Sequence, residues 1–230
     1  ILFYGESPVK WKYSSTDQLY HHEQNIYTNT TNYFLICDLG SGKRIASQPS
    51  SVQPANTYIT KFDDFAVHEQ DLVNLIKSGK EWYGENFDIL TSYSFDNYFP
   101  NIDLPSGIAV RTDIAGRYTA QNFYTLAVNG STRSISLNPY SGIYQYATSA
   151  NDDFNFTGDG PNINVTINKT TAGAVGWLNY FEINVKRNLI VGTSPMNFRS
   201  SLSVGTGNIS EFTISNASTE TIIWEVTDPQ

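Results

Sequence analysis

The stretch NFYTLAVNGSTRSISL, residues 122–137, decides the fold class of this chain. Phe, Tyr, Thr, Leu and Val between residues 122 and 128 suit a β-strand. Asn129-Gly130 follows, and this dipeptide is typical of the tight turn between two antiparallel strands, because both turn positions need positive φ. Residues 134–137 alternate again and predict the returning strand. The stretch therefore predicts a β-hairpin.

Further strands are predicted on both sides of this hairpin. The segments with alternating apolar residues are 9–13, 108–114, 163–167, 181–185 and 212–214. Tyr33–Cys37 is apolar throughout and predicts a buried strand, Gly40-Ser41-Gly42 predicts a turn toward a returning strand near Ile45, and Ile222–Val226 predicts the last strand. Short strands with turn residues between them are typical of an antiparallel β-sandwich or jelly roll. We therefore expect a mainly β fold.

One helix is expected, over residues 63–78. Phe65, His68, Leu72, Leu75 and Ile76 fall at helical spacing, acidic residues stand at the start, and a glycine follows the end. We predict two domains, with an approximate boundary near residue 102. Residues 1–102 form a β-rich subdomain with this helix, and residues 103–230 form a β-sandwich domain. The alternative is one continuous unit.

Composition limits the partners. The 230 residues carry 22 acidic and 14 basic side chains, a net charge of −8. Without a basic cluster, neither nucleic acid nor an anionic membrane surface is an expected partner. No run of about 18 apolar residues predicts a transmembrane helix. A single cysteine and many Asn, Thr and Tyr residues favour an extracytoplasmic location, and both ends are expected to be cut points in a longer protein.

No complete catalytic or metal site is expected. Cys37 continues an apolar run and precedes an acid, so a buried structural role is favoured over a reactive thiol. His21 and His22 are adjacent on a strand and should point to opposite faces, which disfavours a shared metal ion. His68-Glu69 lacks the second histidine that a zinc-binding helix needs.

Acidic groups suggest two weaker sites. Asp152, Asp153 and Asp159 could supply oxygens to a structural calcium ion, although their spacing matches no EF-hand. Five acids between residues 69 and 88 could pair for glycoside hydrolysis, but a solvated helix face is favoured. These five are Glu69, Asp71, Glu81, Glu85 and Asp88.

Trp82, Tyr83 and Glu85 form a candidate interaction surface. Aromatic rings stack on sugars, so a carbohydrate-binding or adhesion module is an alternative function. Burial of Trp82 and Tyr83 in the core is the favoured reading.

Several segments, spread from the first residues to the last, match a family pattern. They are Leu2-Phe3-Tyr4-Gly5, Trp11-Lys12-Tyr13, Tyr33-Phe34-Leu35, the stretch from Asp64 to Phe87, Leu178-Asn179-Tyr180, Arg187-Asn188-Leu189, and Ile223-Trp224-Glu225-Val226-Thr227-Asp228-Pro229. With them the chain resembles the region before the catalytic domain in PorU-like sortases, the gingipain-like cysteine peptidases of the type IX secretion system. Asn179 and Glu225 stand where the family has Asp.

The resemblance implies a function for the parent protein. It would be a cysteine endopeptidase on the outer membrane of a Bacteroidetes-type bacterium, removing C-terminal sorting signals from secreted cargo. The family's catalytic His and Cys would lie beyond residue 230, so the resemblance assigns no catalytic residue or cofactor to this chain. It implies a non-catalytic accessory region, with the catalytic domain, secretion components or cargo as partners.

Overall fold

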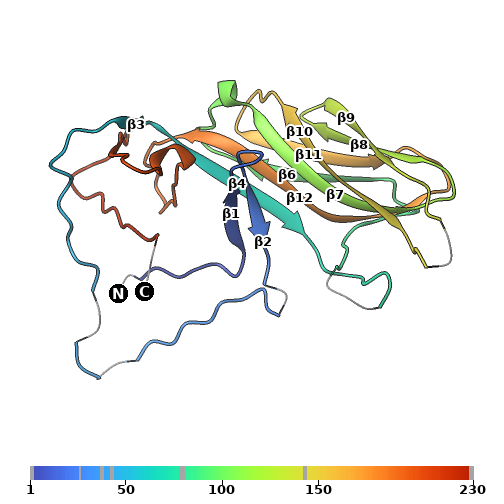
Figure 1. Ribbon diagram of the computed structural model, residues 1–230, viewed down its shortest axis with the longest axis horizontal. Helices are drawn as coiled ribbons and strands as arrows, with labels where there is room; N and C mark the ends of the chain where they lie inside the picture. The colour runs from blue at the N-terminus through green and yellow to red at the C-terminus, as the bar shows by residue number, and fades with distance from the viewer. Residues whose placement is uncertain are drawn as a thin grey trace.

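The computed structural model describes residues 3–25, 27–36, 39–41, 44–77, 81–141 and 144–227. Two antiparallel sheets pack face to face over most of the chain (Figure 1). The first has five strands, with spatial order β10-β7-β12-β4 and β5 beside β12. The second has four strands in the order β6-β11-β8-β9. This arrangement confirms the predicted mainly β, antiparallel sandwich.

The strands of the two main sheets account for most of the fold. The five-stranded sheet contains β4 (Lys61–Glu69), β5 (Asn86–Phe87), β7 (Ile108–Arg117), β10 (Thr148–Phe156) and β12 (Val175–Asn188). The four-stranded sheet contains β6 (Ser92–Tyr98), β8 (Asn122–Val128), β9 (Ser131–Leu137) and β11 (Asn162–Lys169). Strands from before residue 103, β4 and β6, therefore pair with strands from after it, β12 and β11, so a boundary at 102/103 passes through both sheets.

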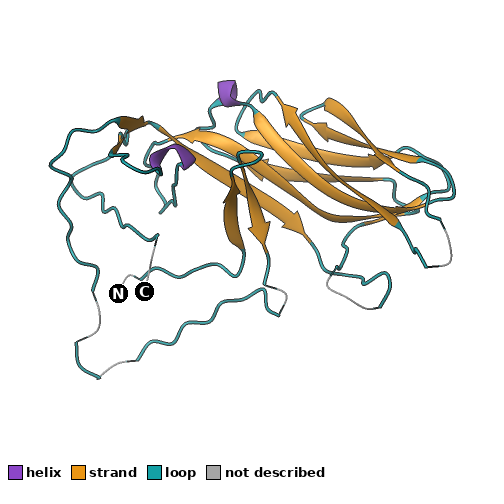
Figure 2. Ribbon diagram, viewed as in Figure 1, coloured by secondary structure: helices purple, strands orange, loops and turns teal. Residues whose placement is uncertain are grey.

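Two smaller pairs complete the described strands. The first is the antiparallel hairpin of β1 (Lys10–Ser14) and β2 (Leu19–Glu23), and the second joins β3 (Thr57–Ile59) to β13 (Ser210–Phe212) in parallel. Helix in the described residues is confined to two short 3-10 turns, η1 (Leu104–Ser106) and η2 (Ser201–Ser203), as Figure 2 shows. Neither turn has the length or the apolar content that crossing a lipid bilayer requires.

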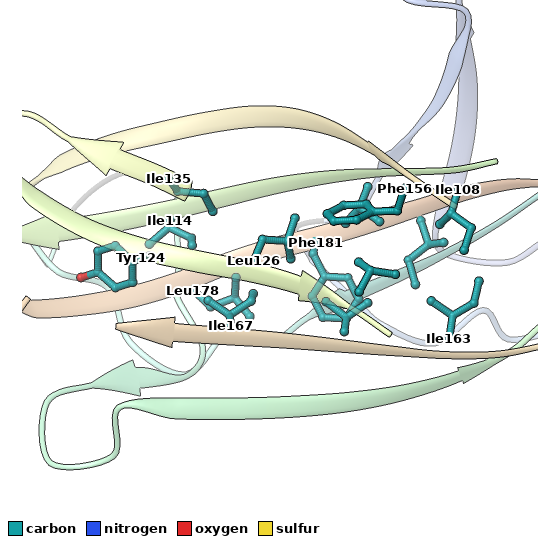
Figure 3. Close-up of a cluster of buried hydrophobic side chains, with 14 of the residues drawn as sticks. Ile108, Ile114, Tyr124, Leu126, Ile135, Phe156, Ile163, Ile167, Leu178 and Phe181 are labelled. Atoms are coloured by element: carbon teal, nitrogen blue, oxygen red, sulfur yellow. The ribbon is translucent and has the colours of Figure 1, made fainter. Parts of the chain in front are cut away.

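The core lies between the two main sheets. Because side chains alternate along a strand, every second residue of β7, β8 and β11 points inward, and β12 follows the same pattern on either side of a bulge between Leu178 and Tyr180. Figure 3 shows several of these residues, among them Ile114, Leu126, Ile167 and Phe181, meeting between the sheets. Tyr124 on β8 reaches the facing sheet at Gly176, where a Cβ atom would come 2.0 Å from its Oη. Gly176 is therefore needed for this close approach.

The turn between β8 and β9 confirms the hairpin prediction. Asn129 has φ of 46° and Gly130 has φ of 85°, as a two-residue turn of the favoured hand requires. The alternating patterns at β1, β7, β11 and β12 also correspond to strands. Their periodicity survives because one face of each strand is more polar than the other.

The predicted helix at residues 63–78 is wrong. Residues 61–69 form β4, residues 70–77 form turns and a single bridge at Val73, and Ser78 lies outside the described part. Apolar residues occupy both faces of β4: Phe62 is buried against Phe198 and Arg187, whereas Phe65 on the other face stacks on Trp11. A strand covered on both faces loses the period-two signal, and the remaining spacing resembles that of a helix.

Two other predicted strands are also absent. Tyr33, Phe34, Leu35 and Ile36 are exposed and form no strand, while Cys37 lies outside the described residues. Residues 221–226 form no strand either, and Ile222 and Ile223 are exposed. Figure 1 shows the segment between β2 and β3 running outside the layered sheets. Apolar composition alone misled both predictions, because a strand also needs a partner strand.

Candidate functional site

A cluster of charged side chains joins the β1–β2 hairpin to the outer face of the five-stranded sheet. Glu182, at the middle of β12, is central to it: its side chain is 2% exposed although it points away from the core. Its two carboxylate oxygens contact Nδ1 of His21 and Nδ1 of His22, and it also accepts a hydrogen bond from the His22 backbone N–H. One buried carboxylate thus fastens two residues of β2.

His22 bridges two strands of the sheet. Its Nε2 lies 2.8 Å from Oε2 of Glu69 on β4, while Nδ1 contacts Glu182 on β12. Burial alone would lower the pKa of His22, but the hydrogen bonds to Glu182 and Glu69 raise that pKa to about 9. Burial would likewise raise the pKa of Glu182, but hydrogen bonds from His22 and His21 lower it. The geometry therefore holds an imidazolium between two carboxylates.

Arg111 extends the cluster across β7 to β10. Its guanidinium donates to both carboxylate oxygens of Asp153 at 2.6 Å and to Asp17 of the hairpin turn at 3.0 Å. Arg111 Nη1 also lies 2.9 Å from His21 Nδ1. Asp17 in turn lies 2.9 Å from His21 Nε2. We call these seven residues the hairpin cluster: Asp17, His21, His22, Glu69, Arg111, Asp153 and Glu182.

Apolar contacts continue the hairpin's attachment. Trp11 of β1 stacks on Phe65 of β4 with ring centroids 4.0 Å apart, and Arg199 lies over the same Phe65 ring. Tyr20 is tied to Asn184 of β12 by hydrogen bonds in both directions. The hairpin is therefore held by packing, neutral hydrogen bonds and ion pairs together.

The chemistry of the hairpin cluster is that of attachment. Both ring nitrogens of His21 and both of His22 lie within 2.9 Å of a carboxylate oxygen. Within the described ranges, no three His, Cys, Asp or Glu side chains form a group that could hold a metal ion. His21 and His22 were expected to point to opposite faces of a strand, yet both contact the Glu182 carboxylate through Nδ1.

A hollow lies just beyond the C-terminal end of β4, beside the bridge between Val73 and Tyr83. Its volume is about 610 Å³. The residues around it include Leu72, Val73, Glu85, Asn86, Tyr93 and Trp177. We call it the Glu85 hollow. Glu85, one of the three residues of the interaction surface predicted from the sequence, lines this hollow.

The three residues of that interaction surface have different environments. Trp82 is 42% exposed, whereas Tyr83 is 6% exposed and packs with Ala115 and Trp177. Glu85 is mostly buried, with Oε1 2.7 Å from Nε2 of His68. Burial opposes the charge on Glu85, but the hydrogen bond with His68 lowers its pKa. The expected burial therefore holds for Tyr83 and not for Trp82.

The remaining predicted acids are spread out. Asp153 pairs with Arg111, and Asp159 accepts a hydrogen bond from Asn129, so they serve different contacts. Burial and the nearby charge of Glu69 raise the pKa of Asp71. The five acids between residues 69 and 88 lie on a strand end and loops, not on one helix face. Cys37 falls outside the described residues, so its predicted core role stays a prediction.

Sequence reasoning missed Glu182 and Arg111. Each is a single charged residue within a strand pattern, more than 80 residues from its histidine partner, and no local motif connects them. The one available signal was a charged residue at the centre of a long, otherwise well-packed strand, because a buried charge needs a partner.

Comparison with known proteins supports the fold. No family model matches the chain, and no curated protein matches it. Among solved structures, dimeric latent PorU from Porphyromonas gingivalis matches with a TM-score of 0.79 and 18% identity. That similarity covers 94% of this chain and 21% of that one, so this chain spans about a fifth of the length of PorU.

Two carbohydrate-binding modules are more distant. The CBM36 module crystallised with calcium and xylotriose has a TM-score of 0.32 and 16% identity, covering 54% of this chain and 99% of its own. The CBM35 module of Abf62 from Cellvibrio japonicus has a TM-score of 0.34 and 16% identity, covering 61% and 98%. Scores this low carry no argument about this chain.

Proposed function

We propose that this chain is a non-catalytic accessory region of a larger, PorU-like cysteine peptidase on the cell surface of a Bacteroidetes-type bacterium. The observation that carries the proposal is the match of nearly the whole chain to about a fifth of PorU at a TM-score of 0.79. The sequence resemblance, which runs from Leu2 to Pro229, points the same way. The peptidase activity, removal of sorting signals from secreted cargo, would belong to the rest of the polypeptide.

The described surface suits a region that packs against other parts of a protein. Large apolar side chains are exposed outside the two-sheet core, and Tyr27, Phe34 and Ile89 are each about 90% exposed. Contiguous exposed apolar residues mark interaction surfaces on soluble proteins. Phe34, Leu35 and Ile36 form such a run on the segment between β2 and β3. The peptidase domain, secretion components or cargo are the proposed partners.

The carbohydrate-binding alternative finds less support. A sugar-binding platform needs neighbouring rings exposed side by side, and Tyr83 is buried against Trp177. Trp82 alone offers only one half-exposed ring. We therefore propose no second function.

The proposal is tested by separating the two parts of the parent protein. Residues 1–230 and the remainder of the polypeptide are produced as separate molecules, mixed, and examined by size-exclusion chromatography with light scattering. We expect a stoichiometric complex, peptidase activity only in the remainder or the complex, and none in residues 1–230. A remainder that folds, processes cargo normally and never associates with residues 1–230 would sink the proposal.

A further inference from the structure

Glu85, which lines the hollow, has one carboxylate oxygen without a hydrogen-bond donor among the described residues. The Glu85 side chain is 10% exposed, and its Oε1 is taken by His68. Its Oε2 is buried and has no hydrogen-bond partner among the described residues. An unsatisfied buried acceptor is costly, and more so when it carries charge, so such an atom in a native fold calls for a partner.

The character of the hollow defines that partner. Of the residues that line it within the described ranges, Glu85 alone is charged, and Tyr93 and Trp177 add aromatic rings to the set. Asp71 lies one residue from Leu72 at the rim, and its pKa is raised by burial and by the charge of Glu69. The charge on the lining is therefore that of the Glu85 carboxylate, which His68 contacts through one oxygen, and a positively charged ligand would pair with the other.

The rim of the hollow is apolar. Leu72 is 67% exposed and Val73 is 37% exposed. Arginine and lysine combine a cationic head with an aliphatic stem that packs along apolar surface, and a cation is also attracted to an aromatic face. A sugar or a neutral amide would satisfy the acceptor, but only a cation would add a charged partner to the one contact that His68 makes with the carboxylate.

We propose that the Glu85 hollow binds the side chain of an arginine or lysine on a partner polypeptide. The cationic head pairs with the Glu85 carboxylate, the stem lies along Leu72 and Val73, and His68 holds the carboxylate from its other side. Glu85 lines the hollow, and binding in this proposal turns its side chain so that Oε2, which is buried in the free chain, meets the ligand. This inference stands on the hollow itself and is independent of whether the parent protein is a sortase.

The test is an NMR titration of the ¹⁵N-labelled chain of residues 1–230 with single amino-acid amides. The probes are N-acetyl-arginine amide and N-acetyl-lysine amide, and N-acetyl-citrulline amide is the neutral counterpart of the first. We expect saturable shifts of the Trp177 indole and Asn86 amide signals, with a dissociation constant of about 1–10 mM for a single side chain. Citrulline amide should bind at least about tenfold more weakly, since it lacks the charge.

Two variants and one control locate the effect. Glu85→Gln should weaken arginine-amide binding at least about tenfold, whereas Glu220→Gln, the same change at an exposed distant site, should leave it unchanged. Leu72→Lys places a competing cation on the exposed rim, should preserve the fold, and should weaken binding as well. The proposal is overturned if no saturable shift occurs by about 50 mM, if citrulline amide binds equally well, or if both hollow variants bind like the unmodified chain.

Discussion

The two outer faces of the sandwich differ in how their polar side chains are accommodated: one face is covered by a hairpin, and the other is open to solvent. The outer face of the five-stranded sheet carries Glu182 and Arg111, and the β1–β2 hairpin covers them. The outer face of the four-stranded sheet carries mainly Ser, Thr and Asn, and these side chains are exposed or half-buried. There, Ser94 and Thr166 lie 2.7 Å apart through their hydroxyls, and Asn164 donates to Asp96.

The difference between the two faces shows that a polar group on a sheet matters most for stability where it is charged and shielded from water. A neutral hydroxyl pair in contact with water gains little by forming, since water replaces it easily. A buried carboxylate has no such substitute, so removing one partner leaves an uncompensated charge. The covered face should therefore be sensitive to single changes and to pH, and the open face should tolerate them.

The largest expected loss of stability comes from a substitution at the centre of the covered face. Glu182→Gln keeps the size of the side chain and removes the charge, leaving the His22 imidazolium facing only Glu69. The free energy of unfolding at pH 6 should fall by about 3–5 kcal/mol in urea denaturation. Glu211→Gln, at an exposed position of β13, should cost no more than about 0.5 kcal/mol. Equal losses for the two variants would show that the cluster contributes nothing special.

Alkaline pH should weaken the same face without a mutation. The pKa of His22 is about 9 in the fold against an ordinary 6.5, so its contribution is fully present below pH 6.5 and lost as pH rises through 9. That difference corresponds to roughly 3 kcal/mol between pH 6 and pH 10. Glu182, whose pKa is lowered, acts in the other direction and weakens the fold below its ordinary pKa of 4.5.

His22→Gln isolates this effect, because all other titrating groups stay. The difference in unfolding free energy between the unmodified chain and the variant should shrink from pH 6 to pH 10. Besides His22, the ionisable groups around it are Glu69, Glu182, Tyr180, His21 and Arg111, and they titrate in both proteins. Parallel pH profiles for the two proteins would contradict the role given to His22.

A smaller effect is expected from the apolar half of the hairpin's attachment. Trp11→Ala removes the ring stacked on Phe65 and should lower stability by about 1–2 kcal/mol, because Trp11 is only half-buried. Backbone amides of β1 and β2 should exchange with solvent faster in hydrogen-exchange measurements. Lys10→Ala, exposed on the same strand, is the matched control and should change neither quantity.

The smallest effect should come from the open face. Thr166→Val removes the hydroxyl that pairs with Ser94 and keeps the branched shape that suits a strand. The unfolding free energy should change by no more than about 0.5 kcal/mol. A loss of 2 kcal/mol or more would mean that this face, too, depends on its polar pairs, and the contrast between the faces would disappear.

The sequence predicts those parts of the fold whose signals are local. The β8–β9 hairpin has both strand periodicity and the Asn129-Gly130 turn, and β11 has one clearly apolar face. The strand β4 was not predicted because the β1–β2 hairpin covers its second face. No local pattern in β4 indicates this covering element, since the hairpin lies 40 or more residues earlier in the chain. The exposed run at Phe34–Ile36 failed for the converse reason, since composition does not supply a strand partner.

The candidate sites were partly accessible from sequence. Glu85 stood out beside Trp82 and Tyr83, and the structure adds its contact with His68 and the concave surface in front of it. Glu182 could not be linked to His21 and His22, because about 160 residues separate them and only the docking of β2 on β12 in the folded chain brings them together. Ion pairs between residues far apart in the sequence cannot be predicted until the three-dimensional fold is known.

The place of β12 in the chain has a consequence for biosynthesis. β12 sits between β7 and β4 in the five-stranded sheet, yet Asp63 on β4 and its partner Lys186 on β12 are 123 residues apart. A ribosome finishes β4 long before it makes Val175, and until then the emerging polypeptide holds an unpaired edge that invites aggregation. Complete assembly of this sheet must therefore follow translation of Asn188, and a nascent chain halted earlier would leave that edge of β4 without β12.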